Sequence, residues 1–282
     1  MRPATLAWRR KRGDSMNELA ADNHWRRIIS FPIRGRTSKP RTEGLTMVID
    51  KGLGLNETKD LFEVAANYID FIKLGFGTSA LYTRDILAQK INLANSYGVM
   101  IYPGGTFMEI AISQNKLKEY ISMVGKLGYP AIEVSDGTVN VSPEVRERAI
   151  AMALDAGLLV LTEVGKKNLR DKVRMEHYAG QIRQDLDSGA FRVIIEGRES
   201  GKDAGFYDGK GRFIADEMEH ILEAVGDTNL LIWEAPLKQQ QQELITQFGP
   251  NVNLGNIPSN EALALEALRV GLRGDTLRLQ FE

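Results

Sequence analysis

The sequence predicts a single-domain (β/α)8 barrel, the TIM barrel, of the α/β class. Three observations support this prediction: short apolar runs alternate with amphipathic stretches, the alternation occurs eight times, and each unit spans about 25 to 35 residues. The apolar runs are continuous and rich in β-branched residues, as in Arg192–Glu196, which is typical of parallel strands buried on both faces. A doubly wound open sheet would produce a similar alternation and is the alternative.

Each unit begins with a predicted strand, a run of mostly apolar residues that ends at a charged residue, glycine or proline. These strands cover residues 45–50, 69–74, 99–102, 131–134, 158–163, 192–196, 230–234 and 252–254. The amphipathic stretches between them predict helices over 57–67, 80–97, 106–127, 143–156, 171–188, 213–225, 237–248 and 258–270. No linker divides this body, so we place one catalytic barrel domain at residues 41–282.

The composition excludes several kinds of site. The chain has 282 residues, of which 43% are hydrophobic and 26% charged, as in ordinary globular proteins. Cysteine is absent, which excludes disulfides, thiolate zinc sites, iron–sulfur clusters and cysteine nucleophiles. The three histidines are far apart in the sequence, so any metal would need oxygen ligands. No apolar run approaches the ~18 residues of a membrane helix, and we expect no membrane partner.

Basic residues are concentrated near the N-terminus. Residues 1–43 carry eleven basic and four acidic side chains, a net charge of +7, whereas the whole chain carries −1. The cluster Arg9–Arg12 lacks the apolar segment of a signal peptide, and Met16 follows it as a candidate start. We interpret residues 1–40 as a basic, partly flexible extension. Because the rest of the chain is acidic, we expect no nucleic-acid partner.

Charged and amide side chains stand at the ends of the predicted strands, followed by glycine or proline. The eight ends read Asp50-Lys51-Gly52, Lys73-Leu74-Gly75, Pro103-Gly104-Gly105-Thr106, Ser135-Asp136-Gly137-Thr138, Glu163-Val164-Gly165-Lys166-Lys167, Glu196-Gly197-Arg198-Glu199, Glu234-Ala235-Pro236 and Gly255-Asn256. Barrel enzymes place their chemistry at this end of the strands. Buried charge is costly unless it is paired or bound to a ligand, so the pattern predicts an active site, with a structural ion-pair network as the alternative.

Three glutamates are the predicted metal ligands. Glu163, Glu196 and Glu234 end the fifth, sixth and seventh predicted strands, and neighbouring strand ends lie within reach of one another. Carboxylate oxygens are the ligands that Mg²⁺ prefers. Enolase-type barrels use such a site to stabilise an enediolate.

The strand ends also carry cations that could bind an anionic substrate or donate a proton: Lys51, Lys73, Lys166, Lys167 and Arg198. If strand alternation continues past Glu163, Lys167 points inward, so we prefer Lys167 to Lys166 as the catalytic lysine. The alternative is that both are solvated loop lysines. Arg198 offers two parallel donors for a carboxylate, phosphate or sulfonate.

Glycine-rich turns are the remaining candidate anion sites. The segment Gly75–Ala80 fits the pattern GxGxxA of dinucleotide-binding proteins, but the next strand lacks the expected acidic residue. We therefore expect glycine N–H groups, including those of Gly104 and Gly105, to receive a phosphate or carboxylate. Gly255 and Asn256 follow the eighth strand, where barrels often bind phosphate.

These motifs together resemble the phosphosulfolactate synthase family. The similar stretches are residues 44–53, 68–80, 99–106, 133–137, 161–167, 194–202, 233–236, 253–257 and 271–276. The resemblance covers about residues 40–277 and all eight units, and only the basic extension departs from it. It implies a cytoplasmic (β/α)8 enzyme, a homo-oligomer in its relatives, that uses Mg²⁺ to add sulfite to phosphoenolpyruvate and forms (R)-phosphosulfolactate. In methanogens this family starts coenzyme M synthesis, and in some bacteria it supplies sulfolactate.

The motifs permit a reaction scheme. Sulfite attacks C3 of phosphoenolpyruvate, the three glutamates hold Mg²⁺ beside the resulting enediolate, and Lys167 protonates C2. The phosphate, carboxylate and sulfite groups are held by Lys51, Lys73 and Arg198. Two alternatives remain: another phosphoenolpyruvate-handling lyase on the same barrel, and a non-catalytic relative of the plant heat-stress-associated type, in which the strand-end carboxylates would be eroded.

Overall fold

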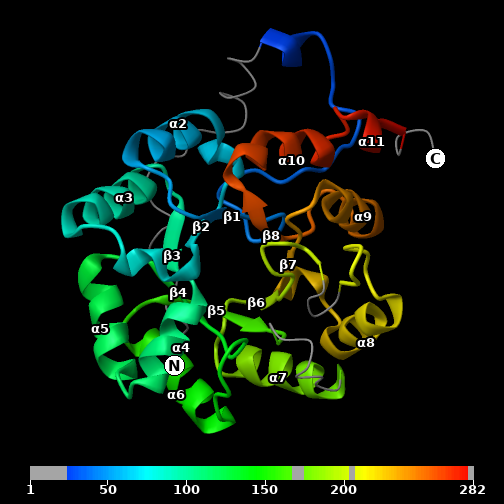
Figure 1. The fold of residues 1–282 in the computed structure, drawn as a ribbon. Coiled ribbons are helices and arrows are strands. Elements are labelled where there is room, and N and C mark those ends of the chain that lie inside the picture. The colour runs from blue at the N-terminus through cyan, green and yellow to red at the C-terminus, as the bar shows by residue number, and fades with distance from the viewer. Residues whose placement is uncertain (1–23, 167–174, 203–206, 279–282) are drawn as a thin grey trace.

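The computed structural model describes residues 24–166, 175–202 and 207–278, and it confirms the predicted barrel (Figure 1). Its eight parallel strands are β1 (Thr46–Asp50), β2 (Phe71–Leu74), β3 (Met100–Pro103), β4 (Ala131–Val134), β5 (Leu159–Val164), β6 (Arg192–Ile195), β7 (Leu231–Glu234) and β8 (Leu254–Pro258). Their hydrogen-bonded order is β3-β2-β1-β8-β7-β6-β5-β4. The two end strands, β3 and β4, lie side by side and close the ring. The carboxyl ends of all eight strands therefore meet at one rim.

Helices surround the strands. They are α2 (Leu55–Ala65), α3 (Arg84–Ser96), α4 (Gly105–Ser113), α5 (Leu117–Leu127), α6 (Pro143–Asp155), α7 (Met175–Asp187), α8 (Ala215–Val225), α9 (Lys238–Phe248), α10 (Ala262–Arg269) and the short α11 (Gly274–Leu277). Short 3-10 segments join them: η2 (His24–Arg27), η3 (Ala66–Tyr68), η4 (Gly75–Ala80), η5 (Thr228–Leu230) and η6 (Ser259–Glu261). The Thr83 and Ser142 side chains cap α3 and α6 by accepting hydrogen bonds from backbone N–H groups, which fixes where these helices begin.

Three differences from the predicted elements have a clear structural reason. The helix expected over 106–127 is two helices, because Asn115 adopts the left-handed backbone conformation and ends α4. The helix expected over 258–270 begins as the 3-10 segment η6. Strand β8 covers 254–258 rather than 252–254, and it pairs with β1 through a bulge: Thr46 pairs with Leu254, but Val48 pairs with Ile257.

Two apolar layers hold the barrel together. The larger layer lies between the strands and the surrounding helices. The smaller layer fills the interior of the barrel and consists of Leu45, Met47, Phe71, Tyr102, Ala131, Leu161, Ile194 and Ile232. Side chains alternate along a strand, so the residue two positions further on each strand also faces inward, closer to the rim. The side chains at those positions therefore pack on top of the inner apolar core, at the rim.

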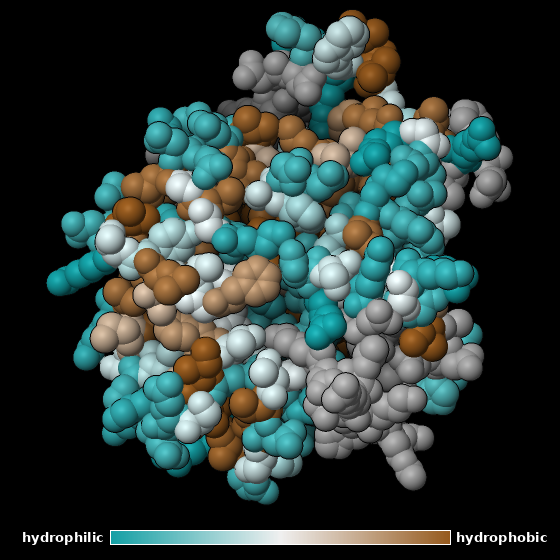
Figure 2. Space-filling view, in the orientation of Figure 1, coloured by the Kyte–Doolittle hydropathy of each residue, from teal (hydrophilic) through white to brown (hydrophobic). Residues whose placement is uncertain are grey.

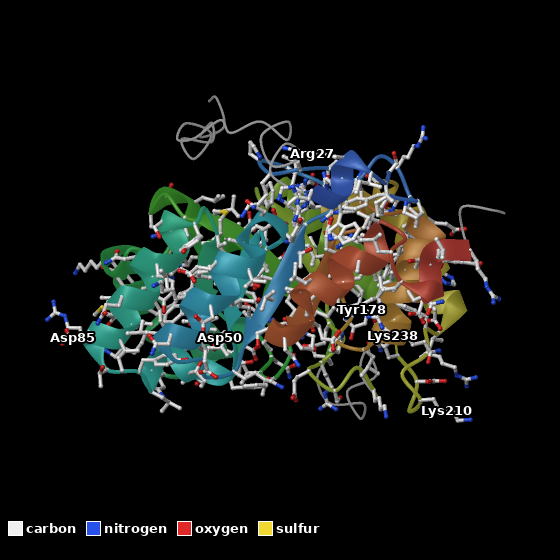
Figure 3. All side chains as sticks on the ribbon, turned by 90° about the horizontal axis from the view of Figure 1, so that it is seen from above. Arg27, Asp50, Asp85, Tyr178, Lys210 and Lys238 are labelled. Carbon is white, nitrogen blue, oxygen red and sulfur yellow. The ribbon has the colours of Figure 1, made fainter. Side chains whose placement is uncertain are left out.

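The segment before β1 packs against the end of the barrel opposite the rim. Figure 3 places Arg27 on one side of the barrel and Asp50 and Lys210 on the other. Arg41 forms a buried ion pair with Asp70, with 2.7 Å between Nη2 and Oδ2. Lys39 donates to the carbonyl oxygens of three residues, Ala66, Ile69 and Gly98. Within the predicted extension of residues 1–40, residues 1–23 lie outside the described part.

The surface is that of an ordinary globular domain. Hydrophilic side chains cover most of the face seen in Figure 1, and hydrophobic ones form small patches between them (Figure 2). In the described parts of the chain, no helix is both long and apolar enough to cross a membrane.

Candidate active site

A layer of charged side chains lies directly above the inner apolar core. Each member stands two residues after a core residue on the same strand: Lys73 after Phe71, Glu133 after Ala131, Glu163 after Leu161, Glu196 after Ile194 and Glu234 after Ile232. The four carboxylates are at most 1% exposed, and Lys73 is 7% exposed. Strand alternation therefore builds a buried charged layer at the rim.

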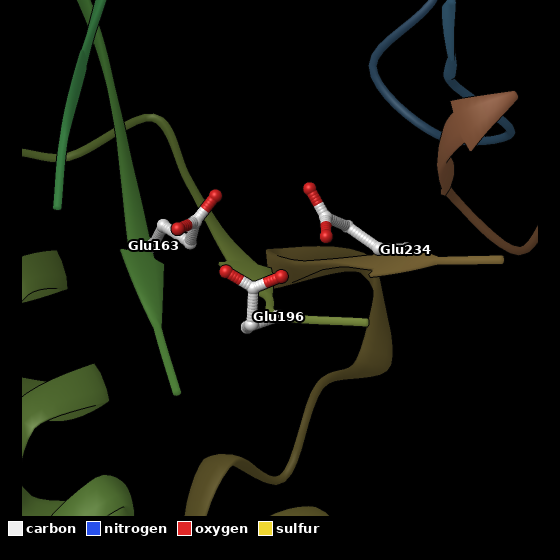
Figure 4. Close-up of side chains that lie close together, drawn as sticks. All are labelled: Glu163, Glu196 and Glu234. Atoms are coloured by element: carbon white, nitrogen blue, oxygen red, sulfur yellow. The ribbon is translucent and has the colours of Figure 1, made fainter. Parts of the chain in front are cut away.

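Glu163, Glu196 and Glu234 converge, as the sequence predicts. Each offers one carboxylate oxygen, and these three oxygens lie within 4.8 Å of one another (Figure 4). They come from three neighbouring strand ends, β5, β6 and β7. Three buried carboxylates at this spacing are a donor set that suits a hard divalent cation. The residues thus fit a metal ion.

Lys73 lies among these carboxylates. Its Nζ is 2.9 Å from Glu163 Oε2, 3.1 Å from Glu234 Oε1 and 3.1 Å from Glu133 Oε2. Burial alone would lower the pKa of Lys73, but the three carboxylates outweigh burial and hold this pKa well above its ordinary value. Lys73 is therefore an ammonium ion whose contacts are to the protein's own carboxylates.

Glu133 belongs to the charged layer, although it was not among the predicted site residues. Its Oε1 accepts a 2.6 Å hydrogen bond from the backbone N–H of Gly105, the first residue of α4. Burial raises the pKa of Glu133 to about 7, although Lys73 opposes this rise. The signal that could have found it is the two-residue alternation from Ala131, which points Glu133 inward like Lys73 and Glu163.

Backbone groups of the loop after β6 orient two of the glutamates. Gly197 N–H donates to Glu234 Oε2 at 2.9 Å, and Arg198 N–H donates to Glu196 Oε1 at 2.6 Å. Gly197 must be glycine, because a Cβ there would lie 2.5 Å from the carbonyl oxygen of Glu234. Arg198 has a φ of 59°, the left-handed conformation that a side chain rarely adopts. This loop is therefore held in a strained form that places N–H groups on the carboxylates.

The predicted lysines occupy different surroundings. Lys166 Nζ donates to the carbonyl oxygen of Asp136 at 2.6 Å and to its Oδ2 at 2.9 Å. Lys51 is exposed and pairs with Glu199 at 2.9 Å, which joins the loops after β1 and β6. Lys167, our preferred catalytic lysine, lies outside the described residues.

The predicted glycine sites are close to the charged layer, but their N–H groups already have acceptors. Gly104 N–H donates to the carbonyl oxygen of Leu74, and Gly105 N–H donates to Glu133. The Gly75–Ala80 segment forms η4, and α3 begins only at Arg84. The helix expected over 80–97 thus begins four residues later, and the segment does not run directly into a helix as dinucleotide-binding loops do.

Gly255 and Asn256 lie on β8 beside β7. Gly255 pairs with Glu234, and a Cβ at Gly255 would collide with the side chain of Met47. Asn256 lies in the bulge together with Gly255, has a φ of 52° and is 3% exposed. Among the described residues its Oδ1 has no hydrogen-bond partner. A buried amide oxygen without a partner, on a strained bulge, is typical of a ligand-binding position.

Comparisons with known proteins show what this chain is similar to. A family model described as (2R)-phospho-3-sulfolactate synthase matches residues 34–275. A phosphosulfolactate synthase of Methanothermobacter thermautotrophicus is 45% identical over 250 residues, which cover 86% of this chain and 94% of that protein. A phosphosulfolactate synthase of Bacillus subtilis is 41% identical over 253 residues, 89% of this chain and 99% of that protein. The 3-hexulose-6-phosphate synthase from Salmonella typhimurium superimposes with a TM-score of 0.54 over 81% of this chain and 100% of that one, and at 12% identity it shows the fold alone.

Proposed function

Because the chain belongs to the (2R)-phospho-3-sulfolactate synthase family, we propose that it catalyses the Mg²⁺-dependent addition of sulfite to phosphoenolpyruvate, giving (R)-2-phospho-3-sulfolactate. The observation that carries this proposal is the buried cluster of Glu163, Glu196 and Glu234 at the carboxyl ends of the strands. A non-catalytic relative would be expected to lose these carboxylates, and here all three are present.

Mg²⁺ is the metal that the donor set favours. The three candidate ligands are all carboxylates, and no cysteine exists anywhere in the chain to favour a softer metal. The described members of the layer are four carboxylates and the Lys73 ammonium, so they carry a surplus of negative charge when all are ionised. A bound Mg²⁺ would offset that surplus and supply positive charge beside the carboxylate of the substrate.

Side chains at the rim would handle the two anions. Sulfite attacks C3 of phosphoenolpyruvate, the electron pair moves toward the carboxylate, and C2 then takes a proton from a lysine. Lys167 stays our first candidate for this donor, and its neighbour Lys166 is the second. Lys51 and Arg198 would hold anionic groups of the substrates, because each carries a positive charge at the rim. We assign Lys73 to the carboxylate cluster, since its contacts are already with three glutamates.

Gly104, Gly105, Gly255 and Asn256 complete the proposed binding surface. The first two form the start of α4, where an anion would compete with Leu74 and Glu133 for the N–H groups. Asn256 would donate from its amide nitrogen to a phosphate or carboxylate beside Glu234, and its unpartnered Oδ1 would accept a hydrogen bond from a protonated group of the substrate. We also propose that the enzyme works in the cytoplasm as a homo-oligomer, as the family resemblance implies, and light scattering would measure its mass in solution.

The activity can be tested with the purified protein, phosphoenolpyruvate, sulfite and Mg²⁺. Phosphorus NMR should show phosphoenolpyruvate converted to one new phosphate ester, and each of the three additions should be required. Glu163→Gln should lower Mg²⁺ affinity measured by calorimetry by about 10-fold or more, since it removes a charged ligand. Conversion of phosphoenolpyruvate without sulfite would instead support another lyase on the same barrel.

A further inference from the structure

A buried arginine lies behind the rim, on the side of β4 and β5. Arg146 of α6 is 4% exposed, and its guanidinium is bidentate to Asp185 of α7, with Nε 2.8 Å from Oδ1 and Nη2 2.6 Å from Oδ2. Burial alone would lower the pKa of Arg146, but Asp185 and its other acidic neighbours outweigh burial and raise it. Arg146 is thus a fixed positive charge held from behind by a helix.

The same guanidinium reaches two groups of the candidate active site. Its Nη1 lies 3.4 Å from Asp136 Oδ1, and its Nη2 donates to the main-chain carbonyl oxygen of Glu163 at 3.0 Å. The other carboxylate oxygen of Asp136 accepts from Lys166 Nζ. A continuous chain of charged contacts therefore runs from Asp185 through Arg146 and Asp136 to Lys166.

This arrangement does more than join two helices. The ion pair with Asp185 would by itself be enough to join α6 to α7. A purely structural role would therefore need no contact between Arg146 and the rim. Arg146 also fixes the backbone at Glu163, three residues before Lys166, and the carboxylate that holds the Lys166 ammonium. Both ends of the segment 163–166 are therefore positioned by one rigid, planar side chain.

We propose that Arg146 is a positioning residue that holds Lys166, through Asp136 and the backbone of Glu163, in the place from which it takes part in the reaction. This inference rests on the proposed function, in which Lys166 is one of two candidate proton donors. A displacement of about 1 Å at such a donor is enough to cost about 100-fold in rate. If Arg146 has this role, replacing it should lower kcat by more than the accompanying loss of folded protein can explain.

The test compares Arg146→Lys with Arg41→Lys. Arg41 is a matched control, because it is also buried and bidentate to an aspartate, Asp70, but lies at the opposite end of the barrel. We expect both variants to lower the melting temperature, and only Arg146→Lys to lower kcat, by about 10-fold or more, with KM for phosphoenolpyruvate nearly unchanged. Equal kcat in the two variants, or a change confined to KM, would overturn the inference.

Two further measurements test the role of Arg146 if Arg146→Lys folds poorly. They also distinguish a failure of this inference from a failure of the proposed function. Asp185→Asn leaves Arg146 in place but removes the charge that anchors it, so it should lower kcat in the same direction. Adding guanidinium at millimolar concentration to Arg146→Ala should restore part of kcat, whereas methylammonium, which lacks the planar fork, should not. No sulfite-dependent turnover in the wild type would contradict the proposed function itself. A different outcome would contradict only the role of Arg146. In that outcome the wild type is active, guanidinium does not rescue Arg146→Ala, and Asp185→Asn has a normal kcat.

Discussion

The charge balance of the site depends on Lys73. This side chain contacts Glu133, Glu163 and Glu234 from the interior of the barrel, below the rim. Without it, the four buried carboxylates of the layer would lose the ammonium that contacts three of them. Like charges so close in a dry environment repel strongly, and such groups either take up protons or bind a cation.

Lys73→Met should therefore destabilise the protein by about 3–5 kcal/mol, the usual cost of removing one partner from a buried ion pair. Mg²⁺ should recover part of this loss, because the variant has a larger negative surplus than the wild type. Urea denaturation with and without Mg²⁺ measures both effects. A variant as stable as the wild type, or one whose Mg²⁺ response does not exceed that of the wild type, would contradict this account of Lys73.

For Asn256 we predict a gain in stability rather than a loss. Its φ of 52° suits glycine, so Asn256→Gly should leave the fold intact and raise its stability by up to about 1 kcal/mol. If the amide binds substrate, the same change should raise KM for phosphoenolpyruvate by about 10-fold. Denaturation and steady-state kinetics on one preparation separate the two effects. An unchanged KM would mean that Asn256 serves the bulge and not the substrate.

At the scale of elements, the start of α4 is where helix packing and site geometry are joined. Gly105 begins the helix and donates to Glu133, and a Cβ there would collide with Ser135 Oγ and lie 2.8 Å from Glu133 Oε1. Gly105→Ala should destabilise the protein by about 1–3 kcal/mol. Gly125→Ala in α5 is the control: no atom lies within 4 Å of its Cβ, so it should stabilise by about 0.5–1 kcal/mol. Urea midpoints that shift alike in both variants would contradict the proposed collision.

The sequence was sufficient for the elements whose pattern is periodic and for the residues that stand at strand ends. Glu163, Glu196 and Glu234 could be placed together because strand order alone makes them neighbours. Glu133 was missed because it lies within β4, and charged residues were considered as site residues only at the ends of strands. The break at Asn115 depends on one backbone angle. The bulge at Asn256 depends on pairing with β1, in which Thr46 pairs with Leu254 and Val48 with Ile257, so neither feature has a local signal in the sequence.

At the scale of the whole molecule, buried tyrosines should make the stability fall at alkaline pH. Burial raises the pKa of Tyr102, Tyr120 and Tyr207 well above the ordinary value of 10.0. Above pH 10 the unfolded chain loses these protons while the folded protein keeps them, so unfolding releases protons and stability falls as pH rises. Absorbance at 295 nm should show these three tyrosines ionising only when the fold is lost. Full ionisation of all tyrosines in a protein that keeps its far-ultraviolet circular dichroism would contradict this.

The first and last strands, β1 and β8, are held together by side chains at the end of the barrel opposite the rim. Arg36 pairs with Glu266 of α10 at 3.0 Å, and the fully buried Arg269 of the same helix donates to the carbonyl oxygens of Leu45 and Val252, next to β1 and β8. These contacts hold the starts of β1 and β8 together at a distance from the rim. Rim loops can therefore be exchanged to redesign specificity without touching these contacts, whereas a substitution of Arg269 would act directly on the pairing of β1 with β8.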